Sequence, residues 1–140
     1  MKKFYSKSNP DLLLHIALSS EEVLSTGSRK DVVPEEQFLQ LGIIKHDAGT
    51  KFRAHKHIFK KGFDTVIAQE SWYVVQGSVK VIFYDVDDEV LDEVVLNKGD
   101  ISITLQGGHN YEILEDNTIV CEYKTGPYEG QKLDKEFISD

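Results

Sequence analysis

The chain has 140 residues, the length of a single domain. Hydrophobic residues make up 40% of it, enough to build a core, and its 24 acidic and 16 basic residues leave a formal net charge of −8. This acidity argues against a nucleic-acid-binding protein, because phosphate contacts need clustered lysine and arginine.

The sequence also argues against a membrane or secreted protein. No apolar run approaches the ~20 residues of a membrane-spanning helix, and the longest, residues 12–18, is interrupted by His15. The basic start at residues 1–7 is not followed by the apolar stretch of a signal peptide. The single cysteine, Cys121, cannot form an internal disulfide and fits a reducing compartment. We therefore expect a cytoplasmic protein.

Hydrophobic periodicity along the chain is mostly that of β-strands. The only helical signal is a short segment at residues 19–24, where Ser19 and Glu22 are spaced like a capping box, and residues 25–34 are expected to form a loop. Short strands separated by turn residues predict a β-sandwich or barrel. The β-rich segments are residues 35–46, two strands within 71–84 around Gly77, and residues 90–96, 101–105, 111–114 and 118–123.

Three histidines and one glutamate are the candidates for metal chemistry. His55 and His57 are two residues apart, so on a strand they face the same way, roughly 6.5 Å apart along the backbone. Glu70 precedes an apolar strand, and His109 opens another. Three imidazoles and a carboxylate suit a divalent transition metal. Each residue also has an ordinary alternative, as a surface histidine, a solvated strand start or a turn residue.

The spacing of these residues resembles the two sequence motifs of the cupin superfamily. Residues 49–57 (GTKFRAHKH) and 70–77 (ESWYVVQG) are similar to the two halves of the first motif, and residues 99–109 (GDISITLQGGH) to the second. Twelve residues, 58–69, separate His57 from Glu70 where cupins usually have three or four. In the second motif Leu105 replaces the usual proline, the step to His109 is one residue short, and Ile113 replaces the trailing asparagine.

The resemblance implies an all-β, single-domain cupin jelly-roll barrel with little helix. Residues 36–125 would form the barrel, residues 1–35 a strand and loop segment packed on it, and residues 126–140 a tail that is either docked or partly disordered. It also implies a homodimer. One divalent metal (iron, manganese, nickel, zinc or copper) would be held by His55, His57, Glu70 and His109, with residues 58–69 as a loop over it. Three neutral imidazoles and one carboxylate would leave the site with a charge of +1, which suits an anionic substrate.

The alternation of side chains along a strand indicates which residues should lie near the metal. Arg53 shares the parity of the two histidines, Trp72 that of Glu70, and Tyr111 that of His109. Arg53, Trp72 and Tyr111 are therefore candidate pocket residues, with Arg53 pairing an anion and Tyr111 as an acid or base, although barrel core is the better expectation for Trp72. The remaining candidates are expected to be ordinary: His15 and His46 as strand or surface residues, Lys60 and Lys61 as solvated loop charges, and Cys121 as a buried apolar residue.

Three functions fit this site. The first is a metal-dependent enzyme of oxygenase or isomerase type, acting on a small anionic or sugar-derived molecule. The second is a cupin that binds a small molecule or sugar without turnover. The third is a metal-free sugar-nucleotide isomerase or epimerase, which a complete set of four metal ligands disfavours. The tail, residues 123–128 with 134–137, is similar to that of WbuC-like cupins associated with surface-polysaccharide genes, which favours carbohydrate metabolism.

Overall fold

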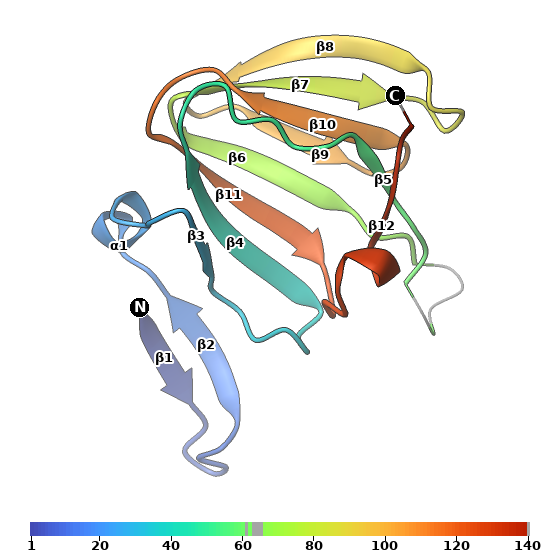
Figure 1. Ribbon diagram of the computed structural model, residues 1–140. Coiled ribbons are helices and arrows are strands. Elements are labelled where there is room, and N and C mark those ends of the chain that lie inside the picture. The colour runs from blue at the N-terminus through green and yellow to red at the C-terminus, as the bar shows by residue number, and fades with distance from the viewer. Residues whose placement is uncertain (61, 63–65, 140) are drawn as a thin grey trace.

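A computed structural model describes residues 1–60, 62 and 66–139. Two five-stranded antiparallel sheets face each other across the core (Figure 1). The first has the order β12-β5-β10-β7-β8, formed by Lys135–Phe137, His55–His57, Gly108–Ile113, Ser78–Tyr84 and Val90–Asn97. The second has the order β3-β4-β11-β6-β9, formed by Arg29–Asp31, Leu39–His46, Thr118–Thr125, Glu70–Gln76 and Ile101–Thr104.

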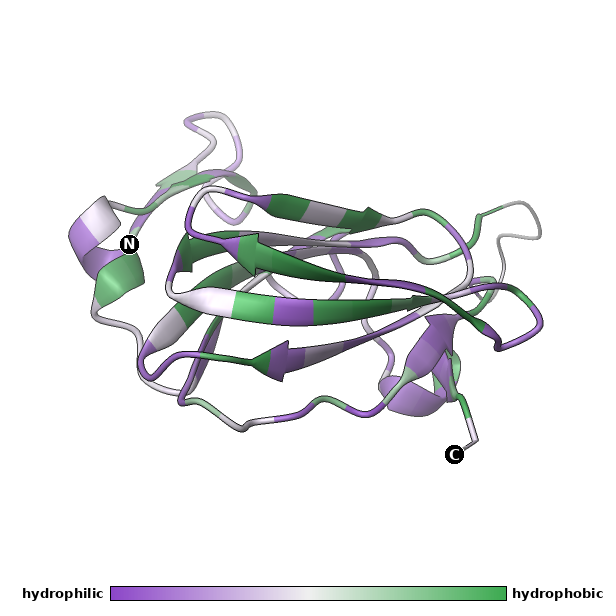
Figure 2. Cartoon of the chain, turned by 90° about the horizontal axis from the view of Figure 1, so that it is seen from above, coloured by the Kyte–Doolittle hydropathy of each residue, from purple (hydrophilic) through white to green (hydrophobic). Residues whose placement is uncertain are grey.

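Hydrophobic and hydrophilic residues alternate along several strands (Figure 2). Successive side chains of a strand point to opposite faces, so one set enters the space between the sheets. One half of this space is filled by an apolar core with residues from both sheets. Its fully or nearly fully buried members are Ile44, Trp72, Val74, Val79, Val81, Leu96, Tyr111, Ile113 and Val120. The other half holds polar residues, among them the metal candidates. The all-β jelly-roll prediction is therefore confirmed, and the metal candidates lie at the polar end of the barrel interior.

The N-terminal residues form a two-stranded sheet, β1 (Lys2–Tyr5) with β2 (Leu13–Ala17), that extends away from the barrel in Figure 1. The helix α1 (Ser20–Leu24) follows, and it starts with the expected capping box between Ser19 and Glu22. The expectation of a loop at residues 25–34 is wrong in part, because Arg29–Asp31 form β3. This short, charged strand is invisible to periodicity and exists because its backbone pairs with the edge of β4.

Parts of the N-terminal segment cover the outer face of the second sheet. Ile16, Leu18 and Val23 pack against a second buried cluster that contains Ile43, Ile119 and Cys121. Cys121 is buried as expected, and burial raises the pKa of its thiol.

The C-terminal residues are docked on the barrel. A short 3-10 helix, η1 (Gln131–Leu133), leads into β12, which pairs with β5 so that Lys135 lies opposite His57 and Phe137 opposite His55. The two histidines of the first motif therefore lie on a strand enclosed between β10 and the C-terminal tail.

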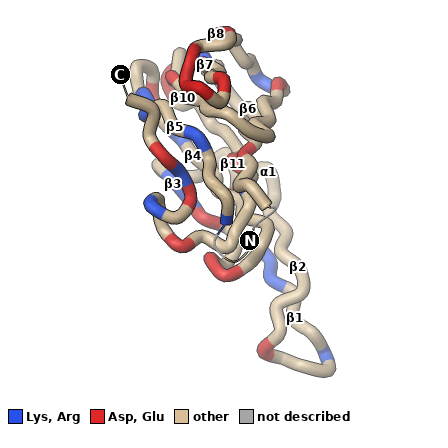
Figure 3. Tube along the Cα trace, turned by 90° about the vertical axis from the view of Figure 1, so that its right-hand side faces the viewer, with Lys and Arg blue, Asp and Glu red and all other residues tan. Residues whose placement is uncertain are grey.

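The charged residues are unevenly distributed. Acidic residues gather in the turn between β7 and β8 (Figure 3). No helix in the described part of the chain is long and apolar enough to cross a membrane.

Candidate metal centre

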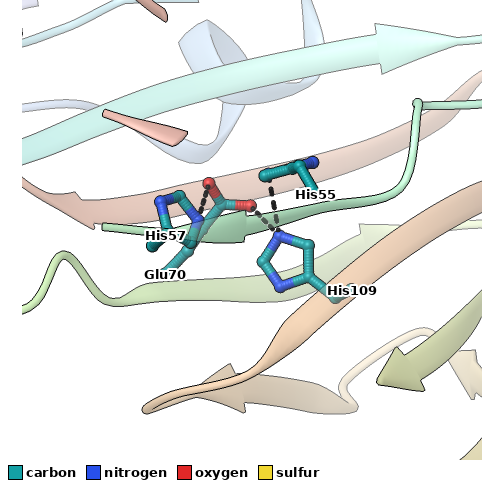
Figure 4. Close-up of side chains that lie close together, drawn as sticks. All are labelled: His55, His57, Glu70 and His109. Atoms are coloured by element: carbon teal, nitrogen blue, oxygen red, sulfur yellow. Dashed lines mark hydrogen bonds and ion pairs between the residues drawn. The ribbon is translucent and has the colours of Figure 1, made fainter. Parts of the chain in front are cut away.

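The four predicted metal ligands converge at one point in the barrel (Figure 4). His55 and His57 come from β5, His109 from β10 and Glu70 from β6, so both sheets contribute. One ligand atom from each residue lies within 4.8 Å of the others. All four side chains are buried, and His109 is completely so.

Backbone register explains how His109 reaches its partners. It pairs directly with His55 across the β10–β5 ladder, so their side chains share a face. Gly107, just before β10, has a φ of +82°, and a Cβ there would lie 2.5 Å from the carbonyl oxygen of Tyr84. Only glycine fits this turn without strain. The shortened spacing in the second motif therefore does not displace His109 from the site.

Each histidine is oriented by a contact of its Nδ1 atom. Nδ1 of His55 lies 2.9 Å from the backbone carbonyl of Arg53, that of His57 lies 3.3 Å from the carbonyl of Asp134, and that of His109 lies 2.7 Å from the Thr104 hydroxyl. Contacts of this kind fix ring orientation and leave Nε2 for a metal. The three Nε2 atoms therefore point toward one another and toward Glu70.

The centre holds a polar atom whose bonding the described residues leave incomplete. Nε2 of His57 is buried and makes no hydrogen bond of good geometry, and its polar contact is an oxygen of Glu70 at 3.4 Å. Nε2 of His55 lies 3.2 Å from Nε2 of His109. Burial, followed by the nearby charges of Lys135 and His109, lowers the pKa of His55 to about 3, so this ring is neutral. Imidazoles that direct their Nε2 atoms at a common point are the arrangement that a transition metal completes.

Glu70 is held as a carboxylate. Its oxygens lie 3.3 Å from Nε2 of His109 and 3.4 Å from Nε2 of His57, and the indole N–H of Trp72 donates to it at 3.0 Å. Burial by itself raises the pKa of Glu70, but the imidazoles of His109 and His57 hold the pKa of this carboxyl well below its usual range. The group is therefore ionised, as a metal ligand must be.

Of the three predicted pocket residues, Trp72 lies in the core, the better expectation for it, and Arg53 lies elsewhere than expected. Arg53 was expected to face the barrel interior, and this is wrong: its side chain is exposed and its guanidinium lies 4.2 Å from the centre of the Phe137 ring. Because β5 begins only at His55, strand alternation does not extend back to Arg53. Arg53 contributes instead through its backbone carbonyl, which orients His55.

Trp72 and Tyr111 belong to the core. Their rings stack with centroids 3.9 Å apart, and the Tyr111 hydroxyl lies 3.0 Å from the Ser102 hydroxyl. Burial, together with the charge of Glu70, raises the pKa of Tyr111, so its hydroxyl stays protonated. The ring of Tyr111 lies 4.9 Å from that of His109. An acid–base role for Tyr111 stays a prediction.

The remaining expectations have mixed outcomes. His15 and His46 are outside the cluster, as expected. Lys60 was expected to be solvated, and this is wrong: it is buried, forms an ion pair with Asp134 and donates to the carbonyl of Pro127 at 3.0 Å. The tail buries it, and sequence periodicity cannot reveal that contact. Lys61 and part of the predicted loop over the metal lie outside the described residues.

A cavity of about 360 Å³ lies on the inner face of the second sheet. Its lining includes Arg29, Phe52, Glu122, Lys124 and Lys135, none of which was predicted as a site residue. Glu122 could have been found, because it shares the parity of the buried Val120 on its strand. Lys135 carries no signal in the sequence, because only the docking of the tail brings it here.

Comparisons with solved structures identify the architecture. KdgF from Halomonas sp. is similar with a TM-score of 0.57 and 21% identity, over 72% of this chain and 79% of that one. The cupin domain of Cnp3 from Schizosaccharomyces pombe is similar with a TM-score of 0.61 and 13% identity, over 89% and 81% of the two chains. This chain has the cupin fold.

A third similar structure is the capsular polysaccharide assembling protein CapF from Staphylococcus aureus. Its TM-score is 0.65 and its identity 21%, over 83% of this chain but only 30% of CapF. No family model matches the sequence, and a search of curated proteins finds no match. At these identities the comparisons establish the fold, and the chemistry must be argued from the residues.

Proposed function

We propose that this cupin binds one divalent transition metal through His55, His57, Glu70 and His109. The observation that carries the proposal is the convergence of four buried ligand atoms within 4.8 Å of one another. Among them, Nε2 of His57 makes no hydrogen bond of good geometry and has only a 3.4 Å contact with Glu70. A buried polar atom that is incompletely satisfied costs free energy, and a metal ion would remove that cost.

When bound, such a metal acts as a Lewis acid on an oxygen of a small molecule or lowers the pKa of a bound water. The chain supplies the rest of the site. Contacts at Nδ1 hold the three rings, and Trp72 holds Glu70. The aromatic stack of Trp72 and Tyr111 lies beside the centre, with the indole N–H of Trp72 on Glu70 and the Tyr111 ring 4.9 Å from that of His109.

Within this proposal the protein acts on a small anionic or sugar-derived molecule by oxygenase or isomerase chemistry. The similarity to CapF, which is described as a capsular polysaccharide assembling protein, supports a role in surface-polysaccharide metabolism, as does the resemblance of the tail to WbuC-like cupins. Binding without turnover would give ligand affinity with no product. The metal-free isomerase would give a protein that carries no metal.

The test is the metal content of protein purified without added metal, measured by inductively coupled plasma mass spectrometry. We expect about one ion per chain in the wild type, and loss of most of it in His55→Ala and in His57→Ala, because each change removes one of four ligands. His15→Ala is the matched control, since His15 is exposed on β2 and outside the cluster. Full metal retention in both cluster variants would show that the site is not the metal site.

We also propose that the protein is a homodimer. The outer face of the second sheet carries an exposed apolar strip made of Tyr73, Ile101, Ile103 and Tyr123, beyond the part covered by the N-terminal segment. Apolar surface that a domain leaves uncovered on a sheet favours association.

A further inference from the structure

The cavity on the inner face of the second sheet adjoins the metal centre. Lys135 lines the cavity, and its Nζ atom lies 3.2 Å from Nε2 of His55. Phe52, another lining residue, has its ring 5.1 Å from that of Trp72, the residue that donates to Glu70. A molecule in this cavity would therefore contact Lys135, the residue that also contacts His55 of the centre.

Binding of a metal ion at the centre would leave the ammonium group of Lys135 without a hydrogen-bond acceptor. Among the described residues its ammonium forms no ion pair with a carboxylate, and the only hydrogen-bond contact of that ammonium is with His55. A metal uses the Nε2 lone pair of His55, so Lys135 loses that acceptor and faces a second positive charge. An anion that contacts both the metal and the ammonium compensates both charges, and a carboxylate with its two oxygens does so well.

Two other lining residues, Glu122 and Arg29, form a second polar group in the cavity. Glu122 is buried and accepts a hydrogen bond from Nη2 of Arg29 at 2.9 Å, and Arg29 also bonds Asp31. Gly42 makes this arrangement possible, because a Cβ at position 42 would lie 2.9 Å from Nη2 of Arg29. With Arg29 already paired to two acids, this group offers carboxylate oxygens and a fixed guanidinium, which suit hydroxyl groups better than a second anion.

The volume of the cavity and its aromatic lining residues restrict the class of ligand further. A volume of about 360 Å³ lies at the lower end of the ~300–1,000 Å³ range of small-molecule pockets, which suits a ligand of the size of a single sugar. Phe52 and Tyr128 supply aromatic surface, and Lys124 lies 3.9 Å from the centre of the Tyr128 ring. Aromatic faces pack well against the C–H face of a sugar ring.

We propose that this cavity binds a small hydroxylated carboxylate, with Lys135 and the metal at its carboxylate and Glu122 with Arg29 at its hydroxyl groups. The inference rests on the proposed metal centre and names the ligand class and the residues that select it. It predicts a specific difference between probes: a sugar acid binds, whereas the neutral sugar lacks the carboxylate and acetate lacks the hydroxyls.

The experiment is isothermal titration calorimetry of Zn²⁺-loaded protein with D-glucuronate, D-glucose and acetate. We expect D-glucuronate to bind most tightly. Lys135→Met removes the ammonium and should weaken D-glucuronate binding by about tenfold or more, whereas Lys135→Arg, which keeps the charge, should retain most of the affinity. Lys132→Met is the matched control in the same tail, since Lys132 is exposed.

Glu122→Gln tests the contact with the hydroxyl groups of the ligand independently of the contact with its carboxylate. It should weaken D-glucuronate binding and leave acetate binding unchanged, because acetate has no hydroxyl for Glu122 to contact. Zinc content is measured for every protein. Three results, each obtained with zinc content at the wild-type level, would overturn this inference and leave the metal centre standing. They are equal affinity for D-glucose and D-glucuronate, no binding of D-glucuronate, and no effect of Lys135→Met on D-glucuronate affinity. Failure to hold zinc overturns both proposals.

Discussion

At the scale of single residues, the contacts around the histidines distinguish this cluster from a chance gathering. A backbone carbonyl or a hydroxyl meets Nδ1 of each ring, and these partners come from three separate segments of the chain, at Arg53, Thr104 and Asp134. Metal-binding histidines usually have such partners on the nitrogen that faces away from the metal. The ligands themselves could be predicted from motif spacing. Their partners could not, because a backbone carbonyl leaves no trace in the residue type.

Glu122 gives a prediction at this scale. Burial, followed by the charge of Glu70, raises the pKa of this carboxyl despite its ion pair with Arg29. A group whose pKa is higher in the folded than in the unfolded chain contributes stability below the unfolded pKa, and this contribution is lost as the pH rises through the folded pKa. The free energy of unfolding of Glu122→Gln, taken relative to the wild type, should therefore increase as the pH rises from about 4 toward neutrality.

The measurement is urea unfolding of metal-free protein at several pH values. Glu129→Gln is the control, because Glu129 is exposed and should show little pH-dependent difference from the wild type. A constant difference between Glu122→Gln and the wild type over this pH range would contradict the argument.

At the scale of elements, the short strand β5 depends on its neighbours. It has three residues, His55–His57, and carries two of the four proposed ligands. Strand β12 pairs along its whole length, and the adjoining Asp134 orients His57 through its carbonyl. The Asp134 side chain is buried and forms ion pairs with Lys60 and Lys124, which attach the tail to the barrel.

Removing the tail should therefore damage the proposed metal centre. A chain ending at residue 130 lacks η1 and β12, and we expect its metal affinity to fall by about 10- to 100-fold, as is typical when the outer partners of metal ligands are lost. Competition with a chromophoric chelator measures this affinity. A chain ending at residue 138 keeps β12 and is the control. Equal metal affinity of the two shortened chains would contradict a role for the tail.

Some strands carry a signal in the sequence, and others form only because they pair with a neighbouring strand. The strands at residues 90–97, 101–104 and 118–125 were predicted to within two residues at each end, because β-forming residues bounded by turn residues mark them in the sequence. Strands β3 and β12 were not predicted. Both are short and charged, and pairing with an existing sheet edge supplies their stability.

At the scale of the whole molecule, the interior is divided between an apolar core and a polar end. The net charge of −8 says little about this interior, where Arg29, Lys124 and Lys135 line the cavity beside Glu122. The outer surface is divided as well, and the apolar strip of Tyr73, Ile101, Ile103 and Tyr123 is the part that we assign to the dimer.

Light scattering coupled to size-exclusion chromatography tests the dimer. The wild type should have twice the 15.9 kDa mass of the chain, and Ile103→Lys should shift it toward the monomer because it buries a charge in the interface. Leu91→Lys is the matched control. Leu91 is 62% exposed, as is Ile103, but it lies on β8 of the other sheet. A monomeric wild type, or equal effects of the two variants, would rule out this interface.

The sequence by itself determined the all-β fold and the four metal candidates. Both are local properties, since alternation and motif spacing follow from which residues share a face of a strand. Only the tertiary structure decided that Arg53 lies outside the barrel, that Lys60 is buried, and that Glu122 and Lys135 line the cavity. The positions of these side chains depend on where a strand begins and on how distant segments of the chain pair. The local pattern of hydrophobic and polar residues encodes neither.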